Sequence, residues 1–386
     1  MTILWICGLP EEVRLKACER TLTETTGAAW GWVLGHLPPP EGVELHVACP
    51  VPGLVEKEMH FGYMGAQWHC YRSIRGEQYL LRIPAIMKMR RLVAAVKPDV
   101  VNGWGGETGC GWIATWLSTR ALVNVQGLLR MLKANEASSG LKARHGRWMD
   151  WRLREVVEAM TYRRAAKLFC ESSQSQLGLR SLYGYDSEVI YQPLRSAFIS
   201  SSPAPEQPGV PTFLYIGEMV DRKGPLDALR AFAEVEDDRS RIEMIGAGPL
   251  EDEAKKFVRA NGLENRVRFG KGLQAKELIA LMLQCDSFIL PSYGDTGPTS
   301  LKEAMSQGLY PICYDNTGPK EHIERYGFGR LCATGKWREL TEAMEYVLAH
   351  RAELRKRGRE AAKAIKRDLS PENIWPRILA AYGEMQ

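Results

Sequence analysis

Several patterns that would assign this chain to a common class of protein are missing from its 386 residues. Its nine cysteines form no Cys-x-x-Cys pair, and their odd number argues against a complete set of disulfides. No stretch approaches the roughly 20 apolar residues that span a bilayer. The first residues, Met1–Gly8, have the pattern of a strand and lack the basic segment of a signal peptide. These absences predict a reducing, cytoplasmic location.

Motifs for metal ions, dinucleotides and nucleic acids are also absent. The seven histidines have no ligand spacing, and Asp237–Asp238 follows an expected helix rather than a strand. No Gly-x-Gly-x-x-Gly follows the first expected strand, which argues against a dinucleotide-dependent oxidoreductase. A net charge of +5 and a pI near 8.6, without a binding motif, give little support for a nucleic-acid partner. We therefore expect no metal ion, no cofactor and no nucleic acid.

Strand and helix patterns alternate along the chain, which predicts an α/β protein with parallel sheets and helices on both faces. The length suits two domains, and residues 200–209, rich in Ser and Pro, resist regular structure as a linker does. The expected strands lie at residues 3–7, 44–48, 68–71, 100–102, 122–125, 168–171 and 188–191, and at 213–216, 242–245, 267–269, 287–290, 310–314 and 330–332.

The predicted organisation is an N-terminal domain at residues 1–199, a linker at 200–210, a C-terminal domain at 211–369 and a final helix at 370–386. Pro371 suits the first position of that helix. Two such domains joined by a hinge would leave a cleft between them, which is a usual place for a ligand site.

Residues 291–303 form the most informative segment. A short apolar strand at 287–290 precedes it, and one acid, Asp295, lies in its loop. A helix that begins near Thr299 carries a second acid, Glu303, in its first turn. Parallel sheets bind ligands at this end of a strand, and the start of the helix favours anions. Two carboxylates suit a hydroxyl-rich ligand, so the segment is typical of a sugar–phosphate site. A capped helix with two solvated acids is the alternative.

Two earlier turns repeat this arrangement. An apolar strand at 212–216 leads to Gly217 and then to Lys223–Gly224, where a lysine reaches a diphosphate as a point charge. A second strand, at 241–245, ends in Gly246–Pro249, a Gly-x-Gly turn. All three turns would lie at one edge of a parallel sheet. A solvated lysine and ordinary turns are the alternative.

Together these segments resemble the donor-binding half of retaining nucleotide-sugar glycosyltransferases with the GT-B fold (group 1, family 4-like). That family shows Gly-Arg and Lys-Gly after a strand, a Gly-x-Gly-Pro turn, and Glu-x7-Glu followed by Ala-Met-x-x-Gly-x-Pro. Here the same order spans residues 210–325, and residues 303–311 read Glu-Ala-Met-Ser-Gln-Gly-Leu-Tyr-Pro. The N-terminal half matches loosely, at 98–101, 125–128 and 165–173. The resemblance implies two doubly wound Rossmann-like domains facing a cleft, and a nucleotide-sugar donor, with UDP favoured.

Several positions depart from the family pattern. The first acid of the signature is Asp295 rather than Glu. Glu218 stands where the family has a phosphate-binding Arg, and a carboxylate there repels a diphosphate. Asn102 and Gln126 stand where the family often carries histidines. These departures leave open a catalytically reduced relative that binds a nucleotide-sugar. A nucleotide-sugar epimerase of similar fold is a further alternative.

The resemblance also implies a role for each matching residue. In the expected catalytic set, Glu303 holds the ribose hydroxyls, Asp295 those of the donor sugar, and Lys223 the diphosphate. Transfer is expected with retention, on one face of the sugar and without a metal ion, while the protein orients both substrates and stabilises charge. The expected donor-binding residues are Gly217, Glu218, Lys223, Gly246, Gly248, Arg268, Gly270, Gly297, Pro298, Thr299, Ser300 and Glu303.

The N-terminal domain is expected to bind the acceptor, a glycan or a lipid-linked glycan in polysaccharide or cell-surface glycan synthesis. A Gly-rich segment after the first strand holds two tryptophans that suit stacking on a sugar or a lipid, and a buried loop anchor is the alternative. The expected acceptor contacts are Gly27, Trp30, Trp32, Asn102, Glu107 and Gln126.

Basic charge is concentrated in one segment. Residues 130–167 hold ten Lys and Arg against four Asp and Glu, a net of +6, so the rest of the chain carries −1. Trp148 and Trp151 lie on an expected helix at 148–164 beside several arginines, a combination that suits an anionic membrane surface. Tryptophans at helical spacing are more often core residues. A peripheral membrane location and an ordinary solvated face are therefore both open.

Overall fold

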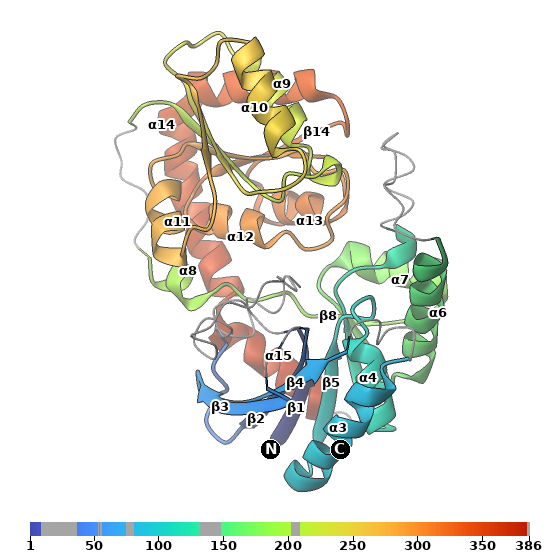
Figure 1. The fold of residues 1–386 in the computed structure, drawn as a ribbon. Helices are drawn as coiled ribbons and strands as arrows, with labels where there is room; N and C mark the ends of the chain where they lie inside the picture. Colours follow the sequence, from blue (N-terminus) through green and yellow to red (C-terminus); the bar gives the residue numbers. More distant parts are fainter. Residues whose placement is uncertain are drawn as a thin grey trace. The chain divides into compact units, whose positions relative to one another are not determined.

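The computed structural model describes residues 1–8, 37–52, 54, 56–74, 81–131, 148–201 and 209–383. The chain divides into two compact units (Figure 1). Within the described ranges, unit 1 contains residues 1–131, 148–195 and 371–383, and unit 2 contains the residues between 196 and 370. The division at 195/196 falls a few residues before the linker that the composition indicates.

Unit 1 is built on an eight-stranded, mostly parallel sheet. Its strands are β1 (Thr2–Ile6), β2 (Glu44–Pro52), β3 (Glu58–Tyr63), β4 (Ala66–Ser73), β5 (Val100–Trp104), β6 (Leu122–Val125), β7 (Lys167–Cys170) and β8 (Glu188–Val189). They follow the order β3-β4-β2-β1-β5-β6-β7-β8. The chain starts at β1, extends the sheet toward β2 and later adds β5 on the other side, so the strand order reverses between β1 and β5.

Helices cover both faces of this sheet. They include α3 (Ile83–Val96), α4 (Cys110–Leu117), α6 (Trp148–Arg164), α7 (Ser173–Tyr183) and α15 (Pro371–Gly383). Side chains of β1 alternate between the two faces: Ile3 and Trp5 pack in one core with α15, whereas Leu4 and Ile6 pack in another with α3 and α4. A strand buried on both faces is apolar throughout, as the sequence of β1 is.

The last helix, α15, completes the core of unit 1. Its Trp375 stacks on Trp5 with ring centroids 5.4 Å apart and an interplanar angle of 10°. The Tyr382 hydroxyl accepts hydrogen bonds from Trp5 Nε1 at 2.9 Å and from Asn102 Nδ2 at 2.7 Å. The C-terminal residues therefore pack against the first strand of the chain.

One strand departs from the purely parallel sheet that the sequence predicts. β3 pairs antiparallel with β4 through a two-residue turn, Met64–Gly65, in which both residues have positive φ (50° and 75°). Such a turn matches the twist of a hairpin. Partly buried and exposed residues alternate along β3 at the edge of the sheet, and this weak apolar signal left the strand unpredicted.

Unit 2 contains a six-stranded parallel sheet. Its strands are β9 (Thr212–Ile216), β10 (Arg241–Ile245), β11 (Val267–Gly270), β12 (Ser287–Leu290), β13 (Tyr310–Tyr314) and β14 (Arg330–Cys332). The order is β11-β10-β9-β12-β13-β14, so the strand order reverses between β9 and β12. Helical segments of the unit are α8 (Ser196–Ser200), the 3₁₀ turn η2 (Asp221–Lys223), α9 (Pro225–Ala233), α10 (Glu251–Ala260), α11 (Ala275–Met282), α12 (Thr299–Ser306), α13 (Thr317–Tyr326) and α14 (Trp337–Asp368).

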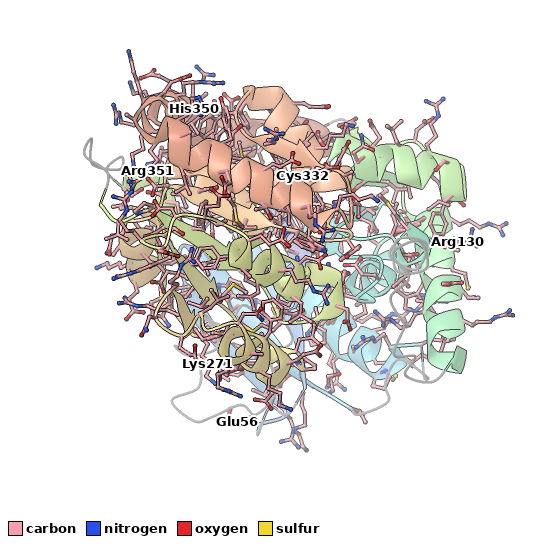
Figure 2. All side chains as sticks on the ribbon, turned by 90° about the horizontal axis from the view of Figure 1, so that it is seen from above. Glu56, Arg130, Lys271, Cys332, His350 and Arg351 are labelled. Carbon is pink, nitrogen blue, oxygen red and sulfur yellow. The ribbon has the colours of Figure 1, made fainter. Side chains whose placement is uncertain are left out.

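A buried ionic cluster fixes α14 to this sheet. Asp286 directly precedes β12, and its carboxylate accepts from Arg351 Nη2 and Arg355 Nε, both at 2.9 Å. The backbone N–H of Thr212, at the start of β9, donates to the same carboxylate at 3.0 Å. Figure 2 shows Arg351, with His350 before it, on α14. The cluster joins β9 and β12 at their amino ends and so fixes these two strands to each other. The predicted site lies at the carboxyl ends of the same two strands.

Candidate functional site

Three loops of unit 2 emerge where the strand order reverses. Residues 217–224 follow β9 and residues 291–298 follow β12, and these two strands are direct neighbours. Residues 246–249 follow β10, which pairs with β9 on its other side. Ligands of open α/β sheets bind at the carboxyl ends of strands where the order reverses. The three loops therefore define the candidate site.

Glycines allow these loops to approach one another closely. Gly224 has φ 62°, and a Cβ there would lie 2.1 Å from the carbonyl oxygen of Pro291. A Cβ at Gly246 would lie 1.9 Å from the carbonyl oxygen of Gly217, and one at Gly248 would lie 2.5 Å from the nearest backbone oxygen. Any side chain at these positions would push the loops apart.

Lys223 and Asp295 join the loops after β9 and β12. The Lys223 ammonium donates to Asp295 Oδ2, and the two side chains are only 18% and 13% exposed. Arg222 adds a second link, since its Nη1 donates to the Gly294 carbonyl oxygen at 2.8 Å. Burial disfavours the charged form of Asp295, but Lys223 and Arg222 outweigh it, so the pKa of Asp295 lies below its ordinary value. The Asp295 carboxyl group is therefore ionised at neutral pH.

The start of α12 completes the site. Pro298 is its N-cap and has no side-chain group that can satisfy the first N–H groups of the helix. Gly297 is buried, and Thr299 and Ser300 are half-buried. Such a helix start attracts anions. Glu303 lies one turn further along and is 3% exposed.

The remaining predicted donor residues lie further from this pair. Glu218 is exposed, and its backbone carbonyl accepts from the Tyr215 hydroxyl at 3.0 Å. Arg268 on β11 is exposed, with a Glu243 carboxylate oxygen 3.8 Å away, and Gly270 ends the same strand. Because β10 and β9 separate β11 from β12, Arg268 and Gly270 lie about 14 Å across the sheet from the β12 loop.

The predicted acceptor residues of unit 1 have different surroundings. Asn102 is fully buried in β5, where its Nδ2 donates to Asn124 Oδ1 at 2.8 Å. Gln126, directly after β6, is also buried, whereas Glu107 lines a pocket. Asn102 thus contributes a polar contact inside the sheet rather than at a surface. The other three predicted residues, Gly27, Trp30 and Trp32, lie outside the described residues.

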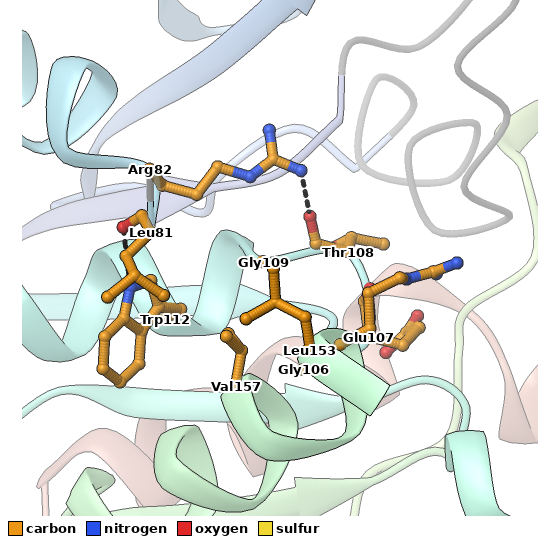
Figure 3. Close-up of a pocket in the computed structure, with 10 residues that line it drawn as sticks. Leu81, Arg82, Gly106, Glu107, Thr108, Gly109, Trp112, Leu153 and Val157 are labelled. Atoms are coloured by element: carbon orange, nitrogen blue, oxygen red, sulfur yellow. Dashed lines mark hydrogen bonds between the residues drawn. The ribbon is translucent and has the colours of Figure 1, made fainter. Parts of the chain in front are cut away.

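The pocket has a volume of about 270 Å³ and lies entirely within unit 1. The start of α3, the loop at residues 105–109 between β5 and α4, and α6 enclose it (Figure 3). Two arginines contact the loop: Arg82 Nη2 donates to the Thr108 carbonyl oxygen at 3.0 Å, and Arg154 Nη2 to that of Glu107 at 3.3 Å. The pocket therefore combines two guanidinium groups with one carboxyl group.

Glu107 is held in its neutral form. Burial raises the pKa of its carboxyl group to about 8, and the nearby carboxyls of Glu158 and Glu171 act in the same direction. Backbone N–H groups of Glu107 and Gly127 oppose the shift without cancelling it. Perturbed carboxyl groups are concentrated at functional sites, although structural networks perturb them too.

Sequence reasoning missed three arginines near these sites. Arg222 could have been found, because it directly precedes Lys223 on the same turn. Arg82 and Arg154 gave no comparable signal in the sequence, since neither follows a strand. Arg82 also has a positive φ of 58°, which is unusual for an arginine and was not predicted. Both are brought to the pocket only by the packing of α3 and α6 around the loop after β5.

Two absences hold for the described part of the chain. No group of three or more His, Cys, Asp or Glu residues there is placed to hold a metal ion. None of the helices in the same ranges combines the length and apolar character that a membrane crossing needs.

Residues 199–365 match the model of the family "Glycosyl transferases group 1". The predicted resemblance to group 1 glycosyltransferases is confirmed over this part of the chain. The match contains all three loops of the candidate site.

Curated relatives are distant and only partly covered. The chain is 29% identical to 2-deoxystreptamine glucosyltransferase of Streptomyces kanamyceticus over 144 residues, which is 37% of each protein. It is 24% identical to glycogen synthase of Mycobacterium tuberculosis over 250 residues, 63% of this chain and 59% of that one. The chain thus spans between about a third and three fifths of the length of these relatives.

Solved structures match the whole chain. Sucrose-phosphate synthase of Thermosynechococcus elongatus has a TM-score of 0.75 at 16% identity, covering 100% of this chain and 98% of that one. HepE of Anabaena, solved in complex with UDP, has a TM-score of 0.72 at 16% identity and full coverage of both chains. The predicted fold class, GT-B with two doubly wound α/β domains, is confirmed.

Proposed function

We propose that the protein is a glycosyltransferase that moves a sugar from a UDP-sugar to a glycan or lipid-linked acceptor with retention, in polysaccharide or cell-surface glycan synthesis. One observation carries the proposal: Lys223, Asp295 and the start of α12 meet at the reversal of strand order in unit 2. A cation, a helix N-terminus and two nearby acids together match a diphosphate linked to hydroxyl-rich groups.

Each group would bind a different part of the donor. Lys223 and the first N–H groups of α12 would bind the diphosphate, and Glu303 would accept hydrogen bonds from the ribose hydroxyls. Asp295 would hold hydroxyls of the donor sugar, and its pairing with Lys223 fixes the lysine near the phosphates. Backbone near Arg268 and Gly270 would frame the base. Unit 2 would thus bind the donor and unit 1 the acceptor.

Retention would follow from the geometry of the bound donor. The leaving diphosphate oxygen would take the proton of the acceptor hydroxyl as the new bond forms on the same face of the sugar. The protein would orient the two substrates and stabilise negative charge that grows on the diphosphate. Lys223 suits this task, because its charge acts at the leaving group without a metal ion.

The comparisons support parts of this proposal. HepE was solved with UDP, which supports UDP as the nucleotide. The relative with 29% identity is a glucosyltransferase, which supports sugar transfer as the reaction. The order of the three loops in the group 1 domain supports the assignment of the donor to unit 2.

The test is a thermal-shift panel with UDP, GDP, ADP, CMP and NAD, followed by an assay of nucleoside diphosphate released from matching nucleotide-sugars. A ligand that binds only the folded protein raises the melting temperature. We expect UDP to give the largest shift and a UDP-sugar to release UDP faster when glycan acceptors are added. A shift with NAD alone, or no release from any nucleotide-sugar, would contradict the proposal.

A nucleotide-sugar-binding relative without transfer is the second candidate. Glu218 favours it, because an exposed carboxylate stands where the family has a phosphate-binding Arg. This candidate predicts UDP binding without release of UDP from any UDP-sugar. The release assay therefore separates the two functions.

We also propose that α6 meets an anionic membrane surface. Arg152, Val156, Met160 and Arg163 are all exposed and follow one another at helical spacing. Basic and apolar residues on one helix face suit an anionic leaflet, and each basic residue near it contributes about 1 kcal/mol. Flotation with anionic and neutral liposomes tests this, with Arg152→Glu/Arg163→Glu as the variant. Equal flotation of both proteins, or none by the wild type, would contradict it.

A further inference from the structure

The pocket of unit 1 lies where a doubly wound sheet ordinarily binds a ligand. The strand order of unit 1 reverses between β1 and β5, and the loop at residues 105–109 leaves the carboxyl end of β5. This loop forms one wall of the pocket. Unit 1 thus repeats the relation between loop and strand order that defines the donor site of unit 2.

The charge of the pocket favours an anion. Among the described residues, the Arg82 guanidinium makes no ion pair, and its one hydrogen bond is to the Thr108 carbonyl oxygen. Arg82 is also the N-cap of α3, and Gly109 is the N-cap of α4, so two helices begin at the pocket. Their positive ends add to the charge of the guanidinium groups. A Cβ at Gly109 would lie 3.0 Å from Arg82 Nε, so glycine leaves the space that the Arg82 side chain occupies.

A carboxyl oxygen in the pocket lacks a partner. Glu107 Oε2 is shielded from solvent and has no hydrogen-bond partner among the described atoms. Buried polar atoms are ordinarily satisfied, so an orphaned one at a pocket suggests a group that binds there. A protonated carboxyl group both donates and accepts. A ligand hydroxyl also donates and accepts, so it can form a hydrogen bond with the protonated Glu107 carboxyl group in either direction.

The remaining wall is apolar. Trp112 is fixed by a hydrogen bond from its Nε1 to the Leu81 carbonyl oxygen at 2.9 Å (Figure 3). Leu153 and Val157 of α6 line the pocket with it. Leu153 and Val157 are only partly buried, so they offer the apolar surface on which the C–H face of a sugar packs. A volume of about 270 Å³ lies just below the ~300 Å³ at which ligand pockets begin, which is room for a single ring rather than a long chain.

We propose that this pocket binds an anionic sugar unit, a ring that carries a phosphate or a carboxylate. The anion would bind Arg82, a ring hydroxyl would bind Glu107, and the ring would pack against Leu153 and Val157. The proposal rests on the proposed function, because it assigns the class of acceptor that unit 1 receives.

Calorimetric titration of the full chain, with saturating UDP at pH 7, tests the pocket. Glucose 6-phosphate and glucuronate are the probes for the two anions, and glucose and inorganic phosphate are the controls. We expect at least one sugar anion to bind about tenfold or more tightly than either control. Arg82→Gln should weaken that binding at least about tenfold, because a charge-assisted hydrogen bond is lost. Val157→Phe should also weaken it, because it fills the pocket while keeping every charge.

Arg91→Gln is the matched control, because Arg91 is exposed on α3 and does not line the pocket. It should leave binding unchanged. Equal binding of inorganic phosphate and sugar phosphate, or equal affinity in wild type, Arg82→Gln and Val157→Phe, would overturn the proposal. A separate UDP titration distinguishes the two failures. UDP binding without sugar-anion binding overturns this proposal alone, whereas loss of UDP binding overturns the proposed function.

Discussion

Replacing Glu107 by glutamine is expected to stabilise unit 1, and to do so more strongly as the pH rises. The folded protein keeps the Glu107 carboxyl protonated because it is buried, with a pKa of about 8 against an ordinary value of 4.5. An unfolded chain loses this proton near pH 4.5. Glutamine has the shape of the protonated carboxyl group and does not titrate. The variant therefore avoids the loss of unfolding free energy that arises because the folded wild type keeps a proton that the unfolded chain releases.

The size of the effect follows from the two pKa values. The raised pKa contributes stability that is fully present below pH 4.5 and is lost as the pH rises toward 8. At about 1.36 kcal/mol per pKa unit, the loss reaches roughly 3 kcal/mol at pH 7 and up to about 5 kcal/mol at pH 8. Glu107→Gln should therefore exceed the wild type in unfolding free energy by an amount that grows by about 1.4 kcal/mol per pH unit.

Urea unfolding followed by tryptophan fluorescence is the suitable assay. A two-domain chain need not unfold in one step, and of the nine tryptophans within the described residues only Trp337 lies in unit 2. The fluorescence signal therefore reports mainly on unit 1. Titrations at pH 5, 6, 7 and 8 give the difference between variant and wild type at each pH. A difference that stays constant across this range would show that Glu107 titrates normally and would refute the reasoning.

The remaining predictions concern unit 2. Lys223→Ala is expected to lower the unfolding free energy by about 2 kcal/mol, because Asp295 is left largely buried without its main cation. Adding Asp295→Asn should recover part of the loss in urea unfolding followed by circular dichroism, which reports on both units, and strictly additive losses would contradict the coupling of the two residues. Glu218→Arg should tighten UDP binding about tenfold in calorimetry, because a guanidinium replaces a repelling carboxylate; weaker binding would give Glu218 a positive role. Asp286→Ala should lower the unfolding free energy by about 3–5 kcal/mol, because Arg351 and Arg355 lose their buried anion. A loss under about 1 kcal/mol would contradict this.

Much of the fold could be predicted from the sequence. The strands expected at 122–125, 287–290, 310–314 and 330–332 have the observed bounds of β6, β12, β13 and β14. Their sequences are short and mostly apolar, and turn residues lie near their ends. β3 escaped prediction because an edge strand buries only part of each side chain and gives a weaker pattern.

The site could be predicted only in part. The sequence predicted that Lys223 and Asp295 each follow a strand, but it did not predict their contact. The two residues are 72 positions apart, and only the pairing of β9 with β12 brings them together. The neutral state of Glu107 depends on burial by α6 and neighbouring acids from distant segments. Such effects arise from packing, which local sequence patterns do not encode.

Calorimetric titration of UDP into the wild type and Glu303→Ala tests the central claim most directly. Glu303 is almost fully buried in the first turns of α12 and carries the proposed contact with the ribose. Losing a charge-assisted hydrogen bond removes about 1.5–3 kcal/mol, so the affinity should fall at least about tenfold in a variant that remains folded by circular dichroism. The account predicts UDP binding by the wild type and this loss in the variant. No UDP binding by the wild type, or equal affinity in both proteins, would contradict it.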